Sequence, residues 1–263
     1  MKPNYKNWVP KGMVFGTTAG AIALVVIFAG ISAFTVDASQ TLRNVLMIIS
    51  GILALVMICV ALWSIFAYNM FSYDGKRQLS KAIIEGTAGY IKIPAGGTCL
   101  DVGCGSGALT IAAAKANPDA KITGIDRWGK EYASFSKKLC EDNAKAEGVS
   151  NVSFAQGDAV KLDFADETFD AVTSNYVYHN ITGVNKQQLL LETLRVLKKG
   201  GTFAIHDIMS KSRYGDMDAF INKLKAQGYE DVRLIRTDNG MFMSKGEAMI
   251  IELTGSSLLV GTK

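Results

Sequence analysis

Two long stretches near the start of the chain contain no charged residue, and they constrain the fold more than any other feature. Residues 13–36 and 44–72 are almost entirely apolar or small. A helix of roughly 20 apolar residues crosses a hydrocarbon core of about 30 Å, and uncharged core helices of this length are rare in soluble domains. The joining segment, residues 37–43, is too short to be a domain. We therefore predict a transmembrane helical hairpin within residues 1–75.

Basic residues flank this predicted hairpin on one side. Three lysines precede the first helix, three basic residues follow the second, and the joining segment holds a single one, Arg43. Because basic residues stay on the cytoplasmic side of a membrane, we expect both ends of the hairpin in the cytoplasm. The expected arrangement is an integral membrane protein whose second domain, residues 76–263, lies in the cytoplasm. The flanking basic residues are Lys2, Lys6, Lys11, Lys76, Arg77 and Lys81.

The charge balance argues against nucleic acid as a partner. Through Lys81 the chain carries seven Lys or Arg and two Asp or Glu, whereas the remainder carries 21 and 22. The basic excess therefore belongs to the membrane flanks. A nucleic-acid-binding face needs a basic patch on the soluble part, and no basic run occurs there.

Small residues recur every four positions at the start of the first apolar stretch, at Gly12, Gly16 and Gly20. This spacing lets two helix backbones approach closely in lipid. Packing against the second helix of the same hairpin is one interpretation, because that partner is already tethered. A homodimer through this face is the other.

The cysteines predict neither a metal site nor a disulfide framework. Cys59, Cys99, Cys104 and Cys140 have no C-x-x-C spacing and no companion histidine cluster, which argues against zinc. A cytoplasmic domain also lies in a reducing compartment.

After Lys76, short β-type runs alternate with helical patterns. Strands are expected at "TCLDV", "AKITGID", "NVSFAQ", "FDAVTSN" and "GTFAIHD". Helices are expected at "KRQLSKAIIEGTAGYI", "SGALTIAAAKA", residues 130–147 and "QQLLLETLRVLKK", the last ended by Gly200 and Gly201. Alternation of this kind predicts an α/β fold with a mostly parallel sheet covered on both faces.

The end of the chain departs from this alternation. An amphipathic helix around Met217–Leu224 is followed by two strand-like runs, "DVRLIRT" and "EAMIIEL", with the turn "DNGMFMSKG" between them. Adjacent strands joined by a glycine-containing turn predict an antiparallel hairpin that closes the sheet.

The segment "CLDVGCGSGALTIAAAK" contains a glycine loop that fits two kinds of nucleotide cofactor. Residues 103–108 match the dinucleotide pattern G-x-G-x-x-G/A, and Asp126 follows at a suitable distance to bind a ribose. Taken alone, this pattern permits an NAD-dependent oxidoreductase.

Three further observations favour S-adenosylmethionine. Asp101 precedes the loop, where a carboxylate would be unfavourable beside a pyrophosphate but would attract an ammonium group. Asp158, in "QGDA" after the third strand, can accept a hydrogen bond from an adenine amine. The tyrosines form no Tyr-x-x-x-Lys pair, which is common in short-chain dehydrogenases.

The motifs "LDVGCGSG", "ITGIDRW", "FAQGDAVKLDFADETFDAVTSN" and "LRVLKKGGTFAIHD" resemble, in order, those of class I S-adenosylmethionine-dependent methyltransferases. The group around "FADETFD" is most similar to methyltransferases of ubiquinone and menaquinone biosynthesis. The resemblance covers roughly Leu79 to Leu253 and implies a Rossmann-like sheet with an antiparallel last strand.

The resemblance also implies a set of cofactor-binding residues. The loop glycines would approach the methionine moiety while Asp101 holds its amino group, and Asp126 would bind the ribose. Asp158 would bind the adenine, and Tyr73 belongs to the region ahead of the first strand that often covers the cofactor in this family. The full set is Tyr73, Asp101, Gly103, Cys104, Gly105, Ser106, Gly107, Asp126, Arg127, Trp128, Gly157, Asp158, Ala159 and Asn175.

The methyl acceptor is expected beside "SNYVYHNI", at the carboxyl end of the fourth strand, where α/β sheets bind ligands. This segment offers Tyr176, Tyr178 and His179 as catalytic candidates. Histidine titrates near neutral pH, so His179 is the candidate base or orienting group, with a loop hydrogen bond as its structural alternative. His206 is a second candidate at the same edge.

The apolar hairpin precedes the catalytic domain with almost no linker, which favours an acceptor that partitions into membranes. A quinone-like ring, a lipid, a thiol or a phenol would fit this expectation. Two other classes of function stay open from the sequence: an NAD-dependent oxidoreductase, and a non-catalytic membrane scaffold that binds S-adenosylmethionine.

Overall fold

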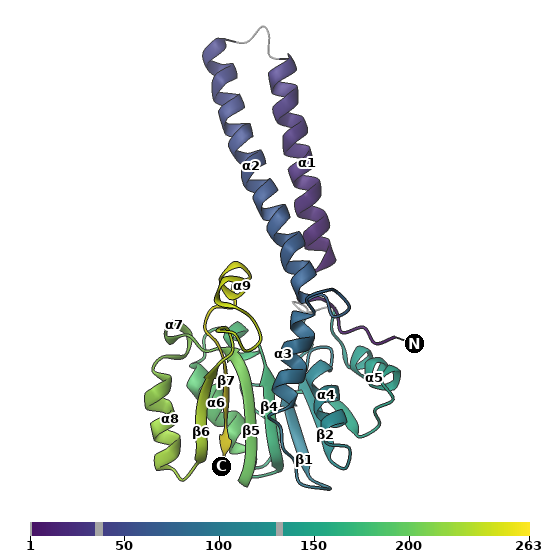
Figure 1. The fold of residues 1–263 in the computed structure, drawn as a ribbon, viewed down its shortest axis with the longest axis vertical. Helices are drawn as coiled ribbons and strands as arrows, with labels where there is room; N and C mark the ends of the chain where they lie inside the picture. Colours follow the sequence, from purple (N-terminus) through teal and green to yellow (C-terminus); the bar gives the residue numbers. More distant parts are fainter. Residues whose placement is uncertain (1, 35–38, 130–133) are drawn as a thin grey trace. The chain divides into compact units, whose positions relative to one another are not determined.

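The computed structural model describes residues 2–34, 39–129 and 134–263. The chain divides into two compact units (Figure 1). One unit is Asn7–Ser80, and the other combines the residues up to Lys6 with Lys81–Lys263. The predicted hairpin domain comprises residues 1–75, whereas the structure groups the residues up to Lys6 with the second unit, which we call the catalytic unit.

The first unit consists of two antiparallel helices, α1 (Lys11–Phe34) and α2 (Gln40–Phe71). Both are long and apolar enough to cross a membrane, by length and composition. The helices pack closely at small residues: the Thr17 and Ser64 hydroxyl oxygens are 2.9 Å apart, and a Cβ added at Gly20 would lie 3.7 Å from Met57. Gly20 therefore faces the second helix. Homodimerisation through Gly12, Gly16 and Gly20 stays a prediction.

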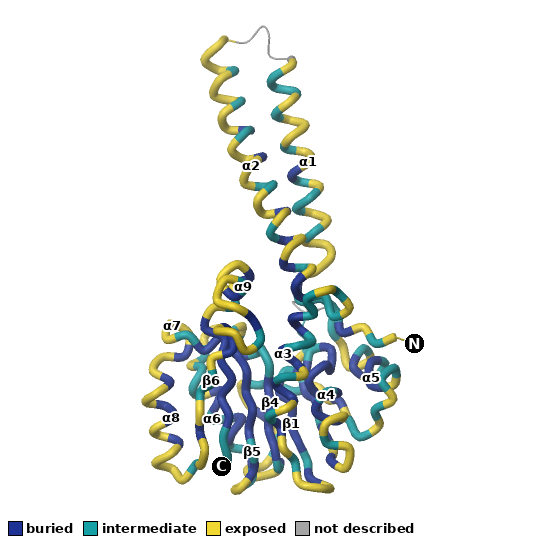
Figure 2. The backbone as a smooth tube through the Cα atoms, viewed as in Figure 1, coloured by how far each residue is buried: buried dark blue, intermediate teal, exposed yellow. Residues whose placement is uncertain are grey.

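Polar side chains inside the two helices bond to their own backbone. The hydroxyl groups of Thr18, Ser50 and Ser64 donate to carbonyl oxygens three or four residues earlier, at 2.7–2.9 Å. Many apolar residues of both helices are exposed, and most of the two helices is coloured yellow or teal in Figure 2. Satisfied hydroxyl groups under an apolar exterior match what a hydrocarbon environment requires.

The second unit is built on a sheet, which contains seven strands in the described part of the chain. The strands are β1 (Thr98–Val102), β2 (Lys121–Asp126), β3 (Val152–Gln156), β4 (Phe169–Asn175), β5 (Leu197–Ile208), β6 (Glu230–Arg236) and β7 (Ser256–Thr262). Their order is β3-β2-β1-β4-β5-β7-β6. The pairs among β1–β5 are parallel, and β7 lies antiparallel between β5 and β6. The predicted mostly parallel sheet with an antiparallel last strand is confirmed.

Helices cover this sheet, and their outward faces are exposed while the central strands β1, β4 and β5 are mostly buried (Figure 2). A large apolar cluster joins strand residues such as Leu100 and Phe203 to Leu190 of α6 and Leu224 of α8. The helices of this part are α3 (Leu79–Ala88), α4 (Ala108–Ala116), α5 (Lys137–Ala146), α6 (Lys186–Arg195), α7 (Lys211–Tyr214), α8 (Met217–Ala226) and α9 (Lys245–Ile250), with a short 3₁₀ helix at Tyr178–Asn180.

The predicted strand "EAMIIEL" is wrong. These residues belong to α9 and the turn after it, and the last strand is "SSLLVGT". Ser244 and Glu247 form a capping box, in which each side chain bonds to the backbone of the other residue. This cap satisfies the first amide groups of a helix. The strand position between β5 and β6 is occupied instead by β7, whose Leu258 and Leu259 are both fully buried.

Two predicted helix boundaries also differ from the structure. Helix α6 ends at Arg195, and Gly200 and Gly201 lie inside β5, where Gly200 adopts a φ of 76° and the pairing with β4 is irregular. Helix α5 begins at Lys137 with a Ser136 cap. Part of the helix predicted over residues 130–147 lies outside the described residues.

Candidate functional site

The glycine loop joins β1 to α4 at the carboxyl edge of the sheet. Gly103, Gly105 and Gly107 have φ values of 76°, 56° and 79°, a region that glycine adopts without steric cost. A Cβ added at Gly103 would lie 2.3 Å from Val177, whereas one at Gly105 would approach, among the described residues, only Phe135, at 4.0 Å. Space beside Gly105 therefore lets a ligand approach the backbone.

Asp101 lies at the base of this loop and is almost fully buried, with 1% of its surface exposed. Its Oδ2 accepts a hydrogen bond from Thr110 Oγ1 at 2.6 Å, and its Oδ1 has no hydrogen-bond partner among the described residues. Burial raises the pKa of Asp101 to about 7, and the bond from Thr110 opposes this shift. A buried acceptor without a partner fits an ammonium group supplied by a ligand.

The end of β2 is tied to the same loop. Asp126 accepts a hydrogen bond from the Gly105 amide at 2.9 Å and another from the Trp128 amide at 2.7 Å. The Trp128 indole in turn donates to the Gly105 carbonyl at 3.0 Å. The two hydrogen bonds from backbone amides leave further lone pairs on the Asp126 carboxylate, which can accept hydrogen bonds from ribose hydroxyls. Arg127, which lies between Asp126 and Trp128 in the sequence, is exposed.

The segment after β3 reaches the same edge. The Gly157 amide donates to the Asp126 carbonyl at 3.1 Å, so β2 and β3 end together. Asp158 is exposed, and its Oδ1 accepts from the Val160 amide at 2.9 Å. Ala159 packs against the main apolar cluster.

Cys104 and Ser106 are buried within the loop. Burial raises the pKa of Cys104 well above its ordinary value, so this thiol stays protonated. Helix α5 supports the neighbouring carbonyl groups: Cys140 Sγ donates to Gly105 at 3.2 Å, and Asn143 Nδ2 donates to Ser106 at 2.9 Å. Sequence motifs gave no signal for the supporting roles of Cys140 and Asn143.

His179 forms a short contact with the carboxylate of Asp207, a residue to which the sequence motifs assign no role. Its Nδ1 lies 2.5 Å from Oδ1 of Asp207 at the end of β5, and its backbone amide donates to Oδ2 at 3.1 Å. Asp207 is fully buried, whereas 15% of the His179 side chain is exposed. Burial acts to raise the pKa of Asp207, but the hydrogen bonds from His179 hold it below its ordinary value. An ionised Asp207 directs Nδ1–H toward itself and leaves Nε2 as the acceptor nitrogen.

Tyr176 lies beside both histidines. Its ring centroid is 4.6 Å from that of His206 and 5.9 Å from that of His179. Its hydroxyl oxygen lies 2.7 Å from Ser256 Oγ, and burial raises its pKa. A φ of 53° at Tyr176 marks a strained backbone position directly after β4.

His206 and Tyr178 are held inside the structure. His206 bonds to Asn175 at 2.8 Å and to Thr237 at 2.7 Å, and burial lowers its pKa to about 3. Tyr178 is fully buried in the apolar cluster, with its hydroxyl oxygen 2.6 Å from Thr193. Both side chains therefore act in packing and orientation, and Asn175 is the edge residue that His206 positions.

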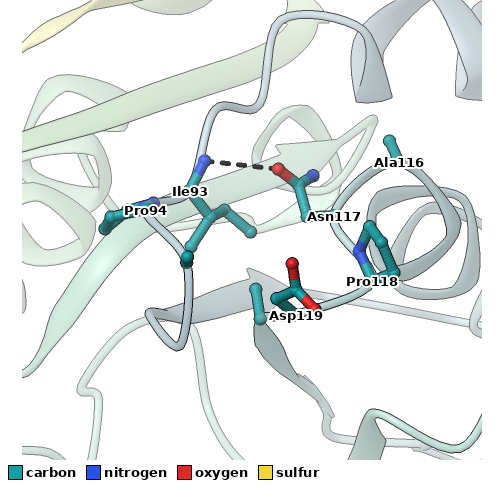
Figure 3. A pocket seen from close by; sticks show the side chains of 8 residues that line it. Ile93, Pro94, Ala116, Asn117, Pro118 and Asp119 are labelled. Carbon is teal, nitrogen blue, oxygen red and sulfur yellow. Dashed lines mark hydrogen bonds between the residues drawn. The ribbon is translucent and has the colours of Figure 1, made fainter.

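The remaining predicted residue, Tyr73, follows α2 in the helical unit, and its contact with a cofactor stays a prediction. A hollow lined by Ile93, Pro94 and residues 116–120 lies at the opposite, amino edge of the sheet (Figure 3). There the Asn117 side chain already bonds to the Ile93 amide at 3.3 Å. The chemistry-bearing residues gather at the carboxyl edge instead. Within the described ranges, no three His, Cys, Asp or Glu side chains are grouped to hold a metal ion.

Comparison with known proteins relates a large part of the chain to one family. The family model described as "Methyltransferase domain" matches residues 93–245, more than half of the chain. The demethylmenaquinone methyltransferase of Alkalihalophilus pseudofirmus is 35% identical over 138 residues, which cover 51% of this chain and 54% of that protein. The chain spans about half the length of the first curated relatives that it matches.

Solved structures share the fold at low identity. The [4+2]-cyclase SpnF superposes with a TM-score of 0.54 and 20% identity, over 71% of this chain and 82% of that chain. Phosphoethanolamine N-methyltransferase 2 of Haemonchus contortus, solved with S-adenosyl-L-methionine, gives 0.51 and 18%, over 76% and 55%. Fold likeness at this identity does not specify a reaction. The matched residues and the sheet order together show that the chain belongs to the methyltransferase-domain family, with the class I S-adenosylmethionine-dependent fold.

Proposed function

We propose that this protein is a membrane-anchored enzyme that uses S-adenosylmethionine to methylate a small lipophilic acceptor with a quinone-type ring. The observation that carries the proposal is the His179–Asp207 pair, which lies at the same sheet edge as the glycine loop and Asp101. The glycine loop and Asp101 suit the cofactor, and the His179–Asp207 pair offers a base for the acceptor.

The residues present fit the cofactor. The buried, unpaired Asp101 Oδ1 suits the ammonium of the methionine moiety, the open side of Gly105 suits a close backbone approach, and Asp126 retains lone pairs for the ribose. Asp158 and Asn175 would contribute from the ends of β3 and β4. When bound, S-adenosylmethionine supplies an electrophilic methyl group on a sulfonium.

His179 is the residue that would act on the acceptor. Methyl transfer to oxygen or carbon requires loss of a proton from the acceptor, and a positioned base accelerates such a step. Asp207 holds Nδ1–H and stabilises the imidazolium formed when Nε2 takes that proton. Tyr176, in ring contact with His179, would form one wall beside the acceptor. Tyr178 is omitted from this proposal because it is fully buried.

Three observations support a lipophilic acceptor. The curated relatives are named demethylmenaquinone methyltransferases, and the chain carries two helices of membrane-spanning length. The connection between β6 and β7, which lies at the carboxyl edge of the sheet, also exposes apolar side chains: Met241 is 39%, Met249 71% and Ile250 47% exposed. Exposed apolar groups near a site are typical of contact with a membrane or an apolar ligand.

The test is methyl transfer by the full chain in proteoliposomes, with release of S-adenosylhomocysteine as the readout. The acceptors are a demethylated naphthoquinol with a long isoprenoid tail, the same ring without the tail, and a soluble amine. We expect turnover of the rings and a higher kcat/KM with the tail. Binding of S-adenosylmethionine without turnover of any acceptor would indicate a scaffold, and binding of NAD instead would indicate an oxidoreductase.

A further inference from the structure

Residues 2–6, which precede the first membrane helix, belong to the same compact unit as Lys81–Lys263. We call this segment the N-terminal strap. Tyr5 within it is only 6% exposed. The burial of Tyr5 therefore comes from packing of the strap within the catalytic unit.

The strap reaches the cofactor loop through one side chain. The Asn4 backbone amide donates to Asn143 Oδ1 at 2.7 Å, and Asn143 Nδ2 donates to the Asn4 carbonyl at 3.2 Å. The same Nδ2 donates to the Ser106 carbonyl of the glycine loop at 2.9 Å. Asn143 is 2% exposed, so it would be left with an unpaired buried oxygen if the strap moved away.

A second set of contacts links the strap to the helices that flank the loop. The Tyr5 hydroxyl donates to Glu147, at the end of α5, at 3.0 Å. Glu147 also pairs with Lys115 in the last turn of α4. Burial acts to raise the pKa of Glu147, but the bonds from Lys115 and Tyr5 hold it below its ordinary value. The strap therefore bonds to Asn143 and Glu147, two residues through which α5 is bonded to the loop and to the helix that begins at the loop.

We infer that the N-terminal strap positions the glycine loop for S-adenosylmethionine, so that the segment next to the first membrane helix is a working part of the cofactor site. Tyr5 and Asn143 are positioning residues. Neither is placed in contact with the cofactor, and both hold the backbone of the glycine loop, which would contact it. The inference rests on the proposed function for the identity of the cofactor. The effect of the strap on the loop can be measured without any cofactor.

The experiment uses the full chain in nanodiscs and two readouts. Hydrogen exchange of the amides of residues 103–108 is measured without cofactor, and the Kd for S-adenosylmethionine is measured by calorimetry. We expect Tyr5→Ala and Asn143→Ala each to speed loop exchange and to raise Kd by at least about fivefold, the cost of one or two hydrogen bonds. Tyr5→Phe, which keeps the ring, should have a smaller effect.

Asn151→Ala is the matched control. Asn151 also bonds to several backbone carbonyls, including Ala114 at 3.3 Å and Ala120 at 2.9 Å, but at the amino edge of the sheet. We expect it to lower the melting temperature while loop exchange and Kd stay at wild-type values. Because the strap acts through Asn143, the double variant with Tyr5→Ala should show less than the product of the two single effects.

Wild-type loop exchange in Tyr5→Ala would overturn the inference, as would an equal rise in Kd for Asn151→Ala. A wild-type chain that binds no S-adenosylmethionine would overturn the proposed function instead. In that case the exchange data, recorded without cofactor, would still decide whether the strap holds the loop.

Discussion

Asp101 combines burial, one hydrogen bond from Thr110 and one oxygen that has no partner in the described part of the chain. Without a ligand, an ionised carboxylate in this position is unfavourable, which is why its pKa rises to about 7. A bound ammonium group would reverse that balance, because an opposite charge favours the ionised form. On the proposed function, Asp101 would couple cofactor affinity to pH.

The first prediction concerns this coupling. Below its pKa of about 7, Asp101 is protonated and a proton competes with the ammonium group. We expect the Kd for S-adenosylmethionine to rise as pH falls from 7 to about 5.5, by up to about tenfold per unit. Calorimetry across this range measures the effect.

Asp101→Asn provides the control for this pH dependence. The variant should bind S-adenosylmethionine at least about 30-fold more weakly, since a neutral amide replaces a charge-assisted acceptor, and its Kd should not change over the same range. It should also melt at or above the wild-type temperature at pH 8, because a buried charge is removed. An equally steep pH dependence in the variant would assign the titration to another group.

The second prediction concerns the His179–Asp207 pair. His179→Ala removes the proposed base and should lower kcat by at least about tenfold. Asp207→Asn keeps the shape of the side chain but can turn its amide to the histidine, which favours the wrong tautomer, so we expect a similar loss. Steady-state kinetics and cofactor calorimetry separate the steps: kcat should fall while the Kd for S-adenosylmethionine stays within about twofold. Unchanged kcat in both variants would leave His179 a structural loop residue.

At the scale of elements, the connection between β6 and β7 shapes the site as much as the parallel strands do. It carries Thr237, which holds His206, and Phe242, whose ring lies 5.5 Å from that of His206. Asp238 within it pairs with Arg236 and accepts from the Gly255 amide at 2.7 Å. These bonds hold the start of the long connection between β6 and β7 close to its end.

The third prediction tests how α3 contacts this connection. A Cβ added at Gly86 would lie 2.2 Å from the Phe242 ring. Ala in place of Gly normally stabilises a helix by up to about 1 kcal/mol, but here the clash should make Gly86→Ala destabilising by about 1–3 kcal/mol. Denaturant unfolding measures the sign directly.

Two variants serve as controls for Gly86→Ala. Gly246→Ala in α9 adds a Cβ with no atom within 4 Å in the described structure, so it should be neutral or stabilising. The pair Gly86→Ala with Phe242→Leu should recover part of the loss because the ring is removed. If Gly86→Ala stabilises the protein as Gly246→Ala does, α3 and Phe242 do not pack together in solution.

At the scale of the whole molecule, the helical unit interrupts the catalytic unit. The chain leaves the catalytic unit at Lys6 and returns to it at Lys81. Both ends of the hairpin are therefore continuous with one folded body. If the two helices span a bilayer, that body and both ends lie on the same side of it.

The fourth prediction tests this topology in intact bacterial cells. In a Cys59→Ser background, a cysteine at Thr41, which is exposed near the start of α2, should react with a membrane-impermeant maleimide added outside. Cysteines at Lys2 and Lys76 should react only after lysis. Labelling of Lys2→Cys in intact cells would exclude a hairpin with both ends in the cytoplasm.

The sequence by itself determined the features that depend on local spacing. Uncharged apolar runs predicted α1 and α2, alternating strand and helix patterns predicted the parallel sheet, and the spacing of Asp101, the loop glycines and Asp126 predicted a cofactor edge. These patterns follow from short-range backbone geometry and burial, which residues close together in the chain dictate. The assignments of Tyr73 and Asp158 to cofactor contacts stay predictions.

Only the tertiary structure decided which distant groups meet. The contact of His179 with Asp207, the core position of Tyr178, the order of β7 between β5 and β6, and the bond of Asn143 to the strap join residues far apart in sequence. No local pattern encodes such pairs, because they form when buried polar groups need partners after the elements have packed. The same holds for "EAMIIEL": its apolar residues suit a strand, but the Ser244–Glu247 cap and the better burial of "SSLLVGT" in the sheet made it a helix.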